Sequence, residues 1–436
     1  MINAKEASES TPEIGRDKTF GTYRLAGLPW VDFDVFHREE LPARIEAGGN
    51  DRVAWDVAGK APIAIGLPDG RSYSYRSRSV GSGEWRVEIE SGVASDARTV
   101  LEIIDHESWL DYLYEYRTRF GLLYSGAVRF ARGDFDTWDD WEPAIRCLYS
   151  GRPIYNPDAI DWVDRQGAPL DLRRSFEVDD DPEDMTHFLR LTGFLLVKRA
   201  YESTHIQALS AALDRVADES VEGELSSWWA SDAKGERFPY RLTYLSDRSK
   251  IFADLYDHAR TRELVALARE EVVPVPDRIE GILAVVKKAG LDEEASGFAN
   301  LAYHTDCGFG ACHTTCPCVL VGIQVDAAGP ASSQLHMMAG SWGKAYHNVP
   351  SQITSERYPL VAIEAEPGDA TVHFGCGLHA GPPPTGQARR RTLYLQHYHP
   401  RAQELIGPYQ GYNQIMPGYG EGDIPNIDEM REKVEV

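Results

Sequence analysis

The stretch NLAYHTDCGFGACHTTCPC, residues 300–318, holds two histidines, one aspartate and four cysteines. If LAYHTD forms a strand, His304 and Asp306 project from one face, because side chains two residues apart in a strand point the same way. His379 follows the strand-like run ATVHF and opens a Gly/Pro-rich segment. Two imidazoles and one carboxylate on one face of an octahedral ion leave three positions open, the pattern of non-haem Fe(II) oxygenases. We therefore predict that His304, Asp306 and His379 bind a metal and form the catalytic centre.

An anion site is predicted in the segment ARRRTLY, residues 388–394. Oxygenases of this kind commonly use an acidic co-substrate that chelates the iron, and its far end needs a cation. In a strand, Arg390 and Thr392 share a face, and a guanidinium beside a hydroxyl can hold a carboxylate by charge-assisted hydrogen bonds. Arg389 and Arg391 would point to the other face, so the choice among the three arginines depends on the register of the strand.

Residues 185–400 resemble the phytanoyl-CoA dioxygenase family of Fe(II)/2-oxoglutarate-dependent oxygenases. The resemblance lies in the opening FLRLTGFLLVKRAYESTHIQALSAALDRV, the HTD motif, the turn SSQLHMMAGSW, the run EPGDATVHFGCGLHAGPPP, and an arginine eleven residues after His379. It implies a double-stranded β-helix, a jelly roll or cupin-like fold with flanking helices. It also implies iron at His304, Asp306 and His379, with 2-oxoglutarate and O2 as co-substrates.

The same resemblance implies roles for three further residues. Arg390 with Thr392 would hold the distal carboxylate of 2-oxoglutarate. The strand before the metal motif often carries a lysine that faces the active site, and AVVKKAG offers Lys287 or Lys288, of which we choose Lys287.

Two features depart from the family pattern or bear on the reaction. Trp342 follows Gly340 and Ser341 where relatives usually have a histidine, so we expect that side of the pocket to be reshaped. Halogenating relatives replace the acid of the metal motif with a small residue, but Asp306 is present here. Hydroxylation or another oxidation is therefore favoured over halogenation.

Other residues have rival interpretations. Cys307, Cys312, Cys316 and Cys318 with His313 could form a zinc site, but structural zinc sites use two short pairs of ligands that are well separated. We expect reduced cysteines instead. Several histidines are expected to be ordinary hydrogen-bonding residues: His336, His347, His373, His397 and His399. The acids in GDFDTWDDW lack the glycine and the terminal glutamate of a calcium loop, and acids at the start of a helix need no ion.

The predicted fold class is α+β, with an N-terminal extension (1–25), an α+β domain (26–150), a linker (151–184), the oxygenase domain (185–400) and a C-terminal tail (401–436). Short strand-like runs with turn signals open the first domain, including a hairpin at Asp69-Gly70, and a helical pattern follows in DHESWLDYLYEYRTRFG. In the oxygenase domain, STHIQALSAALDRVADE predicts a helix with Thr204 and Gln207 as a capping box.

Residues 50–150 resemble the sterol-carrier-protein type-two-like domain, which is α+β and usually encloses an apolar tail. The resemblance lies in LPDGRSYSYR, DHESWLDYLYEY and LLYSGAVRFARGDFDTWDDWEPAIRCL. Seven of the ten tryptophans lie in or just after this region: Trp30, Trp55, Trp85, Trp109, Trp138, Trp141 and Trp162. They could form its core or line a lipid cavity, and both interpretations stay open.

The composition limits the partners. A formal net charge of −23 repels phosphate backbones and anionic head groups, so nucleic acid and membrane surfaces are not expected to bind. We expect no membrane span and no secretory signal, and hence a cytoplasmic protein with reduced cysteines.

These observations predict an oxygenase that hydroxylates or otherwise oxidises an apolar or acyl-linked small molecule, with an N-terminal domain that binds or presents it. Two alternatives use the same residues differently. One is a non-catalytic lipid carrier with a structural barrel, and the other is a zinc hydrolase with the same three ligands.

Overall fold

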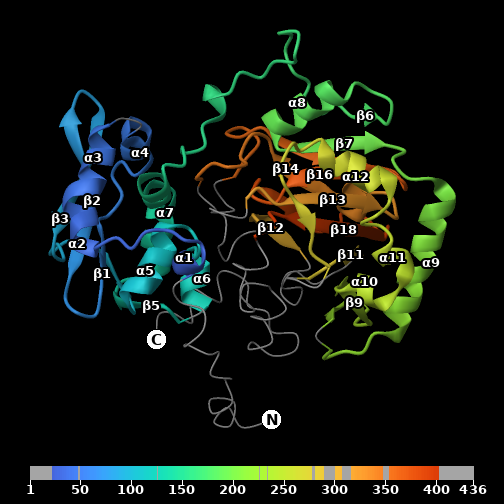
Figure 1. The fold of residues 1–436 in the computed structure, drawn as a ribbon, viewed down its shortest axis with the longest axis horizontal. Coiled ribbons are helices and arrows are strands. Elements are labelled where there is room, and N and C mark those ends of the chain that lie inside the picture. The colour runs from blue at the N-terminus through green and yellow to red at the C-terminus, as the bar shows by residue number, and fades with distance from the viewer. Residues whose placement is uncertain are drawn as a thin grey trace.

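The protein is seen here as a computed structural model that describes residues 22–47, 50–124, 126–224, 226–232, 234–276, 280–288, 300–306, 316–346 and 353–401. Helices and sheets are mixed, as predicted, and they form two lobes (Figure 1). Each lobe has its own large hydrophobic core. In the described part of the chain, no helix is both long enough and apolar enough to cross a membrane.

The first lobe contains a five-stranded sheet with the order β3-β2-β1-β4-β5. Its strands are β1 (Ile63–Gly66), β2 (Ser72–Gly81), β3 (Glu84–Ser91), β4 (Thr99–Ile103) and β5 (Val128–Arg132). β1 runs antiparallel to β2 and parallel to β4. The hairpin predicted at Asp69-Gly70 is confirmed, and Gly70 has a φ of +91°, which a residue with a side chain rarely adopts.

Helices surround this sheet: α1 (Thr22–Leu25), α2 (Phe33–Val35), a π-helical turn (Phe36–Glu40), α3 (Leu41–Glu46), α4 (Asn50–Asp56), α5 (His106–Leu113), α6 (Arg119–Tyr124) and α7 (Phe135–Ser150). The prediction of strands from residue 26 was wrong up to Asp56, where the chain is largely helical. Phe33 and Phe36 are fully buried at helical spacing in that part. The helix predicted from Asp105 onward ends early, since Glu115 has a φ of +59°.

Tryptophans form part of the first core. Trp109, Trp138 and Trp141 are fully buried, whereas Trp30 and Trp55 are more than half exposed. The core interpretation is thus supported for three of the seven tryptophans. Asp134, one of the acids in GDFDTWDDW, caps α7 by accepting a hydrogen bond from the Thr137 N–H, as expected for an acid at a helix start.

The second lobe contains two further sheets. The larger has the order β6-β7-β16-β13-β18-β11-β9-β8, and β10 also pairs with β18; the smaller has the order β12-β17-β14-β15. The bounds of the larger sheet are β6 (Phe176–Glu177), β7 (Phe194–Lys198), β8 (Ser227–Ser231), β9 (Arg237–Leu242), β10 (Val273–Pro274), β11 (Leu283–Lys287), β13 (Val319–Gln324), β16 (Ala370–Phe374) and β18 (Arg390–Tyr398). Those of the smaller sheet are β12 (Leu301–His304), β14 (Leu335–Met338), β15 (Leu360–Ile363) and β17 (His379–Gly381). Two sheets of this kind are consistent with the predicted cupin-like fold.

Helices of the second lobe pack on the outer face of the larger sheet: α8 (Pro182–Thr192), α9 (Ser203–Glu219), α10 (Leu245–Arg248), α11 (Lys250–Ala253) and α12 (Ala259–Ala266). The helix predicted for residues 203–219 is confirmed. Its predicted capping box was wrong, because the N-cap residue is Glu202, which makes no side-chain cap bond.

Alternation along the strands of the larger sheet separates two environments. In β13, Val319, Val321 and Ile323 join the core beneath the helices, whereas Leu320 lines a cavity on the other side. In β18, Leu393 and Leu395 also join the core beneath the helices. The inner face of the larger sheet is therefore turned toward the smaller sheet, with the cavity between them.

The segment between the two lobes has structure of its own. It includes a 3-10 turn (Pro157–Ala159), β6, and the start of α8. Ile154 forms a parallel bridge with Ala345 of the second lobe. The Tyr155 hydroxyl donates to the carbonyl oxygen of Ala339 at 2.5 Å. These contacts attach the end of the first lobe to the second lobe.

Candidate metal centre and co-substrate pocket

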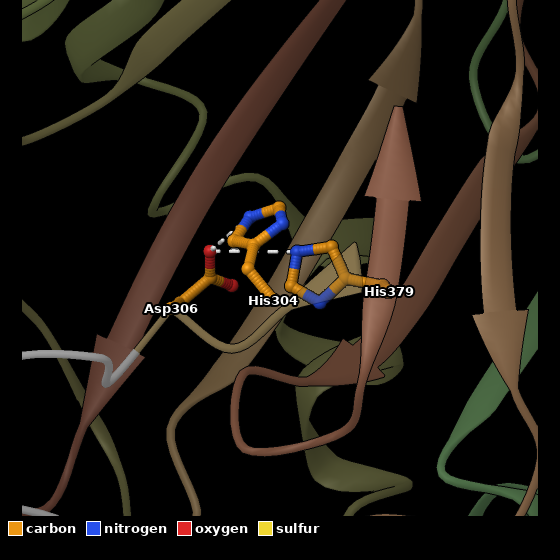
Figure 2. A group of neighbouring side chains, drawn as sticks. All are labelled: His304, Asp306 and His379. Atoms are coloured by element: carbon orange, nitrogen blue, oxygen red, sulfur yellow. Dashed lines mark ion pairs between the residues drawn. The ribbon is translucent and has the colours of Figure 1, made fainter. Parts of the chain in front are cut away.

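His304, Asp306 and His379 come together in the second lobe (Figure 2). His304 ends β12 and His379 begins β17, and the two residues are directly opposite in this antiparallel pair. Asp306 lies just after β12, where its N–H donates to the carbonyl oxygen of Gly375 at 2.8 Å. One ligand atom from each residue lies within 4.8 Å of the other two. The strand register and this turn thus make the three side chains converge.

Backbone carbonyl groups orient both imidazoles. Nδ1 of His304 lies 2.8 Å from the carbonyl oxygen of Ala302, and Nδ1 of His379 lies 2.9 Å from that of Gly377. A ring that donates its Nδ1–H in this way keeps a lone pair on Nε2. Both Nε2 atoms face Oδ1 of Asp306, at 3.9 Å from His304 and 3.5 Å from His379 (Figure 2).

The charges of these residues fit a cation site. Burial alone would raise the pKa of Asp306, but the neighbouring His379 and the other two histidines hold it well below its usual range. Burial, and then His379, lower the pKa of His304 to about 4. A charged carboxylate and a neutral imidazole are the protonation states that bind a metal.

A cavity opens beside this triad. Both sheets contribute to its wall, which is lined by Tyr240, Arg241, Glu280, Leu283, Val285, Lys287, Leu301, His304, Asp306, Leu320, Leu335, His373, His379, Ala380, Gly381, Arg390, Tyr394, Gln396 and Tyr398. The lining combines leucine and tyrosine side chains with a few charged groups, as small-molecule sites commonly do.

Two cationic side chains enter the cavity from neighbouring strands. Arg390 of β18 is directly opposite Lys287 of β11, and both residues are buried. Nε of Arg390 has no hydrogen-bond partner within the described ranges. Lys287 donates from Nζ to Oδ1 of Asn300 at 3.0 Å and to the carbonyl oxygen of Gly381 at 2.9 Å. Burial, and then Arg390, lower the pKa of Lys287 well below its usual value.

The register of β18 distinguishes the three arginines. Arg391 points outward and bonds to Asp326 and to Asp214 of α9, each at 2.8 Å. Arg389 is partly exposed beside the same two acids. Only Arg390 lines the cavity. Lys288 turns away from it, with Nζ 4.4 Å from the ring centre of Phe238.

Thr392 is fully buried but does not line the cavity. Its hydroxyl donates to Oε1 of Gln324 at 2.9 Å. The structure therefore brings Arg390 and Lys287 to the cavity wall, but not Thr392.

Sequence reasoning missed several residues of the pocket. Arg241 of β9 donates from Nε to Glu280 at 2.7 Å, and its Nη2 contacts the second oxygen of the same carboxylate. His373, expected to be an ordinary buried histidine, lies 3.9 Å from Asp306. Arg241 and Glu280 are 39 positions apart in the sequence, so no local motif joins them.

Trp342 does not reshape the pocket in the way expected from the sequence. It is absent from the cavity wall, its Nε1 donates to the carbonyl oxygen of Arg190 at 2.8 Å, and its ring lies 4.3 Å from that of Phe374. This indole packs between α8 and β16 and belongs to the core of the lobe.

The cysteine-rich segment is described only in part. Cys307, Cys312 and His313 lie outside the described residues. Cys318 and Cys376 are buried, and Cys316 is partly buried. The hydrogen bond with Cys316, and then burial, raise the pKa of Cys376, which keeps its thiol protonated.

The side chains of this site fit a bound metal ion with a keto acid beside it. Oδ2 of Asp306 is buried without a hydrogen-bond partner among the described residues, and so is Nε of Arg390. A buried guanidinium N–H without a partner is costly, so Nε of Arg390 marks a place for an anionic ligand. Two imidazoles and one carboxylate suit Fe(II), and a guanidinium suits the carboxylate of a keto acid.

A family of known proteins matches the part of the chain that holds the candidate site. Residues 189–392 match the model of the family described as phytanoyl-CoA dioxygenase (PhyH). No curated protein sequence matches the chain.

Solved structures resemble about half of the chain. AviO1 from Streptomyces viridochromogenes Tue57 is 21% identical, with a TM-score of 0.39 over 50% of this chain and 96% of that one. HygX from Streptomyces hygroscopicus, with nickel and 2-oxoglutarate bound, is 16% identical, with a TM-score of 0.35 over 50% and 85%. EctD from S. alaskensis with bound Fe is 14% identical, with a TM-score of 0.37 over 52% and 80%. These values are too low to assign a residue or a substrate.

The matched residues include the triad, Lys287, Arg390 and Thr392. The resemblance drawn above for residues 185–400 covers nearly the same stretch. The likeness of this chain to the phytanoyl-CoA dioxygenase family therefore lies in residues 189–392, which hold the whole candidate metal centre.

Proposed function

We propose that this protein is an Fe(II)- and 2-oxoglutarate-dependent oxygenase in which His304, Asp306 and His379 hold the iron. The observation that carries the proposal is the convergence of these three side chains beside a cavity that also contains a buried arginine. The match of residues 189–392 to a family of dioxygenases supports it independently.

Iron bound with 2-oxoglutarate and dioxygen would supply the oxidising power that protein side chains lack. The chain itself would position the reactants. The triad would leave one side of a bound ion open to the cavity, since its residues come from β12, from β17 and from Asp306 just after β12. Arg390 would bind the distal carboxylate of 2-oxoglutarate through its Nε, which has no partner within the described part of the chain. Lys287 would support this binding from the adjacent strand β11, and Thr392 would support it from β18, two residues after Arg390.

The walls of the cavity bear on the substrate. Leu283, Leu301 and Leu335 offer apolar contact, and Tyr240 and Tyr398 add aromatic faces. We propose a small molecule with an apolar or acyl-linked part, which the oxygenase hydroxylates or otherwise oxidises. Burial in this wall would exclude water from the reacting atoms.

We further propose that the first lobe is sterol-carrier-like and binds or presents the substrate. Its mixed five-stranded sheet, with a helix-rich connection between β4 and β5, supports the α+β class of that domain. The tight packing of Trp109, Trp138 and Trp141 supports a filled core at those positions.

The test is anaerobic reconstitution of the whole chain with Fe(II) and 2-oxoglutarate, followed by addition of O2. We expect succinate release coupled to O2 uptake. Asp306→Ala should abolish both, whereas Asp254→Ala, which removes an exposed acid of the second lobe, should not. A lipid carrier would release no succinate, and a zinc hydrolase would act with zinc and consume no O2. Either result would overturn the proposal.

A further inference from the structure

A third histidine reaches the candidate metal centre from a strand that carries none of its three ligands. His373 lies in β16, is 1% exposed and lines the same cavity. Its Nε2 is 3.9 Å from Oδ2 of Asp306, and its ring centre is 5.2 Å from that of His379. The side chain is therefore turned toward the metal motif.

The two oxygens of Asp306 have different neighbours. Oδ1 faces the Nε2 atoms of His304 and His379, whereas Oδ2 faces the Nε2 atom of His373. Oδ2 is buried and has no hydrogen-bond partner in the described part of the chain. A carboxylate that ligates a metal through one oxygen is normally held by a hydrogen bond to the other. His373 is placed to provide that bond.

The ring of His373 also differs from the rings of the two candidate ligands. Nδ1 of His304 and Nδ1 of His379 are held by backbone carbonyl oxygens, which commits their Nε2 atoms to accept. Nδ1 of His373 is buried without a partner among the described residues. Its proton is therefore free to lie on Nε2, where the ring can donate to Oδ2.

We propose that His373 is a positioning residue that donates its Nε2–H to Oδ2 of Asp306 when the metal binds, so that Asp306 ligates through Oδ1 alone. This inference rests on the proposed metal centre and adds a fourth side chain to it. Ligation through both oxygens would fill one of the three positions that a two-histidine, one-carboxylate site keeps open. His373 would thus preserve room for the co-substrate and O2.

His373 is not itself placed as a ligand. The residues whose ligand atoms lie within 4.8 Å of one another are His304, Asp306 and His379, and within the described ranges His373 is not part of that group. His373 would therefore act by orienting the carboxylate of Asp306.

The test uses the whole chain without iron and titrates it with Co(II), whose visible absorption reports coordination number. His373→Phe keeps a flat ring but removes the donor. We expect it to weaken Co(II) binding about 10- to 100-fold, the usual effect of removing a partner of a metal ligand, and to change the visible spectrum. His373→Gln, which restores an N–H donor, should recover most of both. If the Phe variant fails to fold, His373→Met makes the same comparison.

His397→Phe is the matched control. His397 is also a buried histidine of the larger sheet whose Nδ1 has no hydrogen-bond partner among the described residues, but it packs beside Tyr256 and does not line the cavity. We expect its Co(II) affinity and spectrum to equal those of the unaltered protein. A general effect of losing a buried imidazole would appear in both variants and would count against the proposal.

Three other outcomes would overturn the inference. One is unchanged Co(II) affinity and spectrum in His373→Phe, and another is no recovery in His373→Gln. The third is a Co(II)-shifted NMR spectrum with three exchangeable ring N–H signals that fall to two in His373→Phe, since His373 would then be a ligand. Failure of the proposed function looks different: the unaltered protein would bind no Co(II), or His304→Ala would bind it equally well.

Discussion

Lys287 lies directly across the β11–β18 pair from Arg390, so two basic side chains approach one cavity from adjacent strands. Burial, and then the charge of Arg390, lower the pKa of Lys287 well below its usual value. A dianionic ligand bound between them would restore the charge of the lysine, because an opposite charge nearby favours the ionised form.

We therefore expect 2-oxoglutarate to bind with uptake of up to about one proton. Calorimetric titrations near pH 8 in buffers of different ionisation enthalpy measure this number. Lys287→Met should bind 2-oxoglutarate more weakly and take up no proton. Equal proton uptake by the variant would assign the titration to another group.

Adjacent arginines should have separate effects. Arg390→Gln should raise the KM for 2-oxoglutarate about 10- to 100-fold, the equivalent of one charge-assisted hydrogen-bonding group at 1.5–3 kcal/mol. It should not lower thermal stability, since it removes a buried charge whose Nε has no partner among the described residues.

Arg391→Gln is the matched comparison in the same strand. It should lower the free energy of unfolding by about 1–3 kcal/mol, because Arg391 bonds to Asp326 and Asp214 on the outer face. The KM for 2-oxoglutarate should stay unchanged. An exchange of these two outcomes would mean that the register of β18 differs from the one described.

Substitution of Trp342 should affect stability and not the co-substrate. Its ring packs on Phe374 and its Nε1 donates to the carbonyl oxygen of Arg190, away from the cavity. Trp342→Ala should therefore cost about 2–4 kcal/mol of unfolding free energy in a denaturant titration. The KM for 2-oxoglutarate should stay within about twofold, and a larger change would restore the expectation that this position shapes the pocket.

The first lobe should lose stability in mild acid. His37 is buried, with Nε2 2.6 Å from the hydroxyl of Tyr75, and burial lowers its pKa from 6.5 to about 4. The unfolded chain thus binds a proton at His37 between these pH values and the folded chain does not, so stability falls as the pH drops from about 6.5 to about 4. The contribution of this one residue is about 3 kcal/mol.

Denaturant titrations at pH 7 and pH 4.5, followed by tryptophan fluorescence, measure that loss. His37→Phe should make the difference between the two pH values smaller, whereas His106→Phe, at a partly exposed position of the same lobe, should leave it unchanged. The idea fails if His37→Phe shows the full difference.

Local patterns predicted part of this architecture. A period of two placed Arg390 and Arg391 on opposite faces of a strand, because side-chain alternation depends on the backbone alone. The helix at 203–219 followed from its apolar spacing, although its cap did not, since the N-cap residue Glu202 lies two residues before Thr204, where the expected motif begins. The HTD motif and His379 could be paired because two imidazoles and one carboxylate are the typical ligands of a non-haem iron site, and the family resemblance agreed with that choice.

Other features depend on contacts between distant segments. His373 shares its residue type with many ordinary buried histidines, and nothing in ATVHF indicates that β16 lies within reach of Asp306. Arg241 and Glu280 meet through the neighbouring β9 and β11, an order of strands that alternation does not reveal. Helices before Asp56 were missed because they are short and interrupted.

The pairing of His304 with His379 sets an order of events during synthesis. The two imidazoles belong to strands far apart in the chain, and β13 to β16 are made between them. A nascent polypeptide that has emerged only through His304 offers an ion two of the three side chains and no closed barrel. If the triad binds iron as proposed, high-affinity loading would wait until β17 has left the ribosome and docked, so that folding would come first and metal acquisition second.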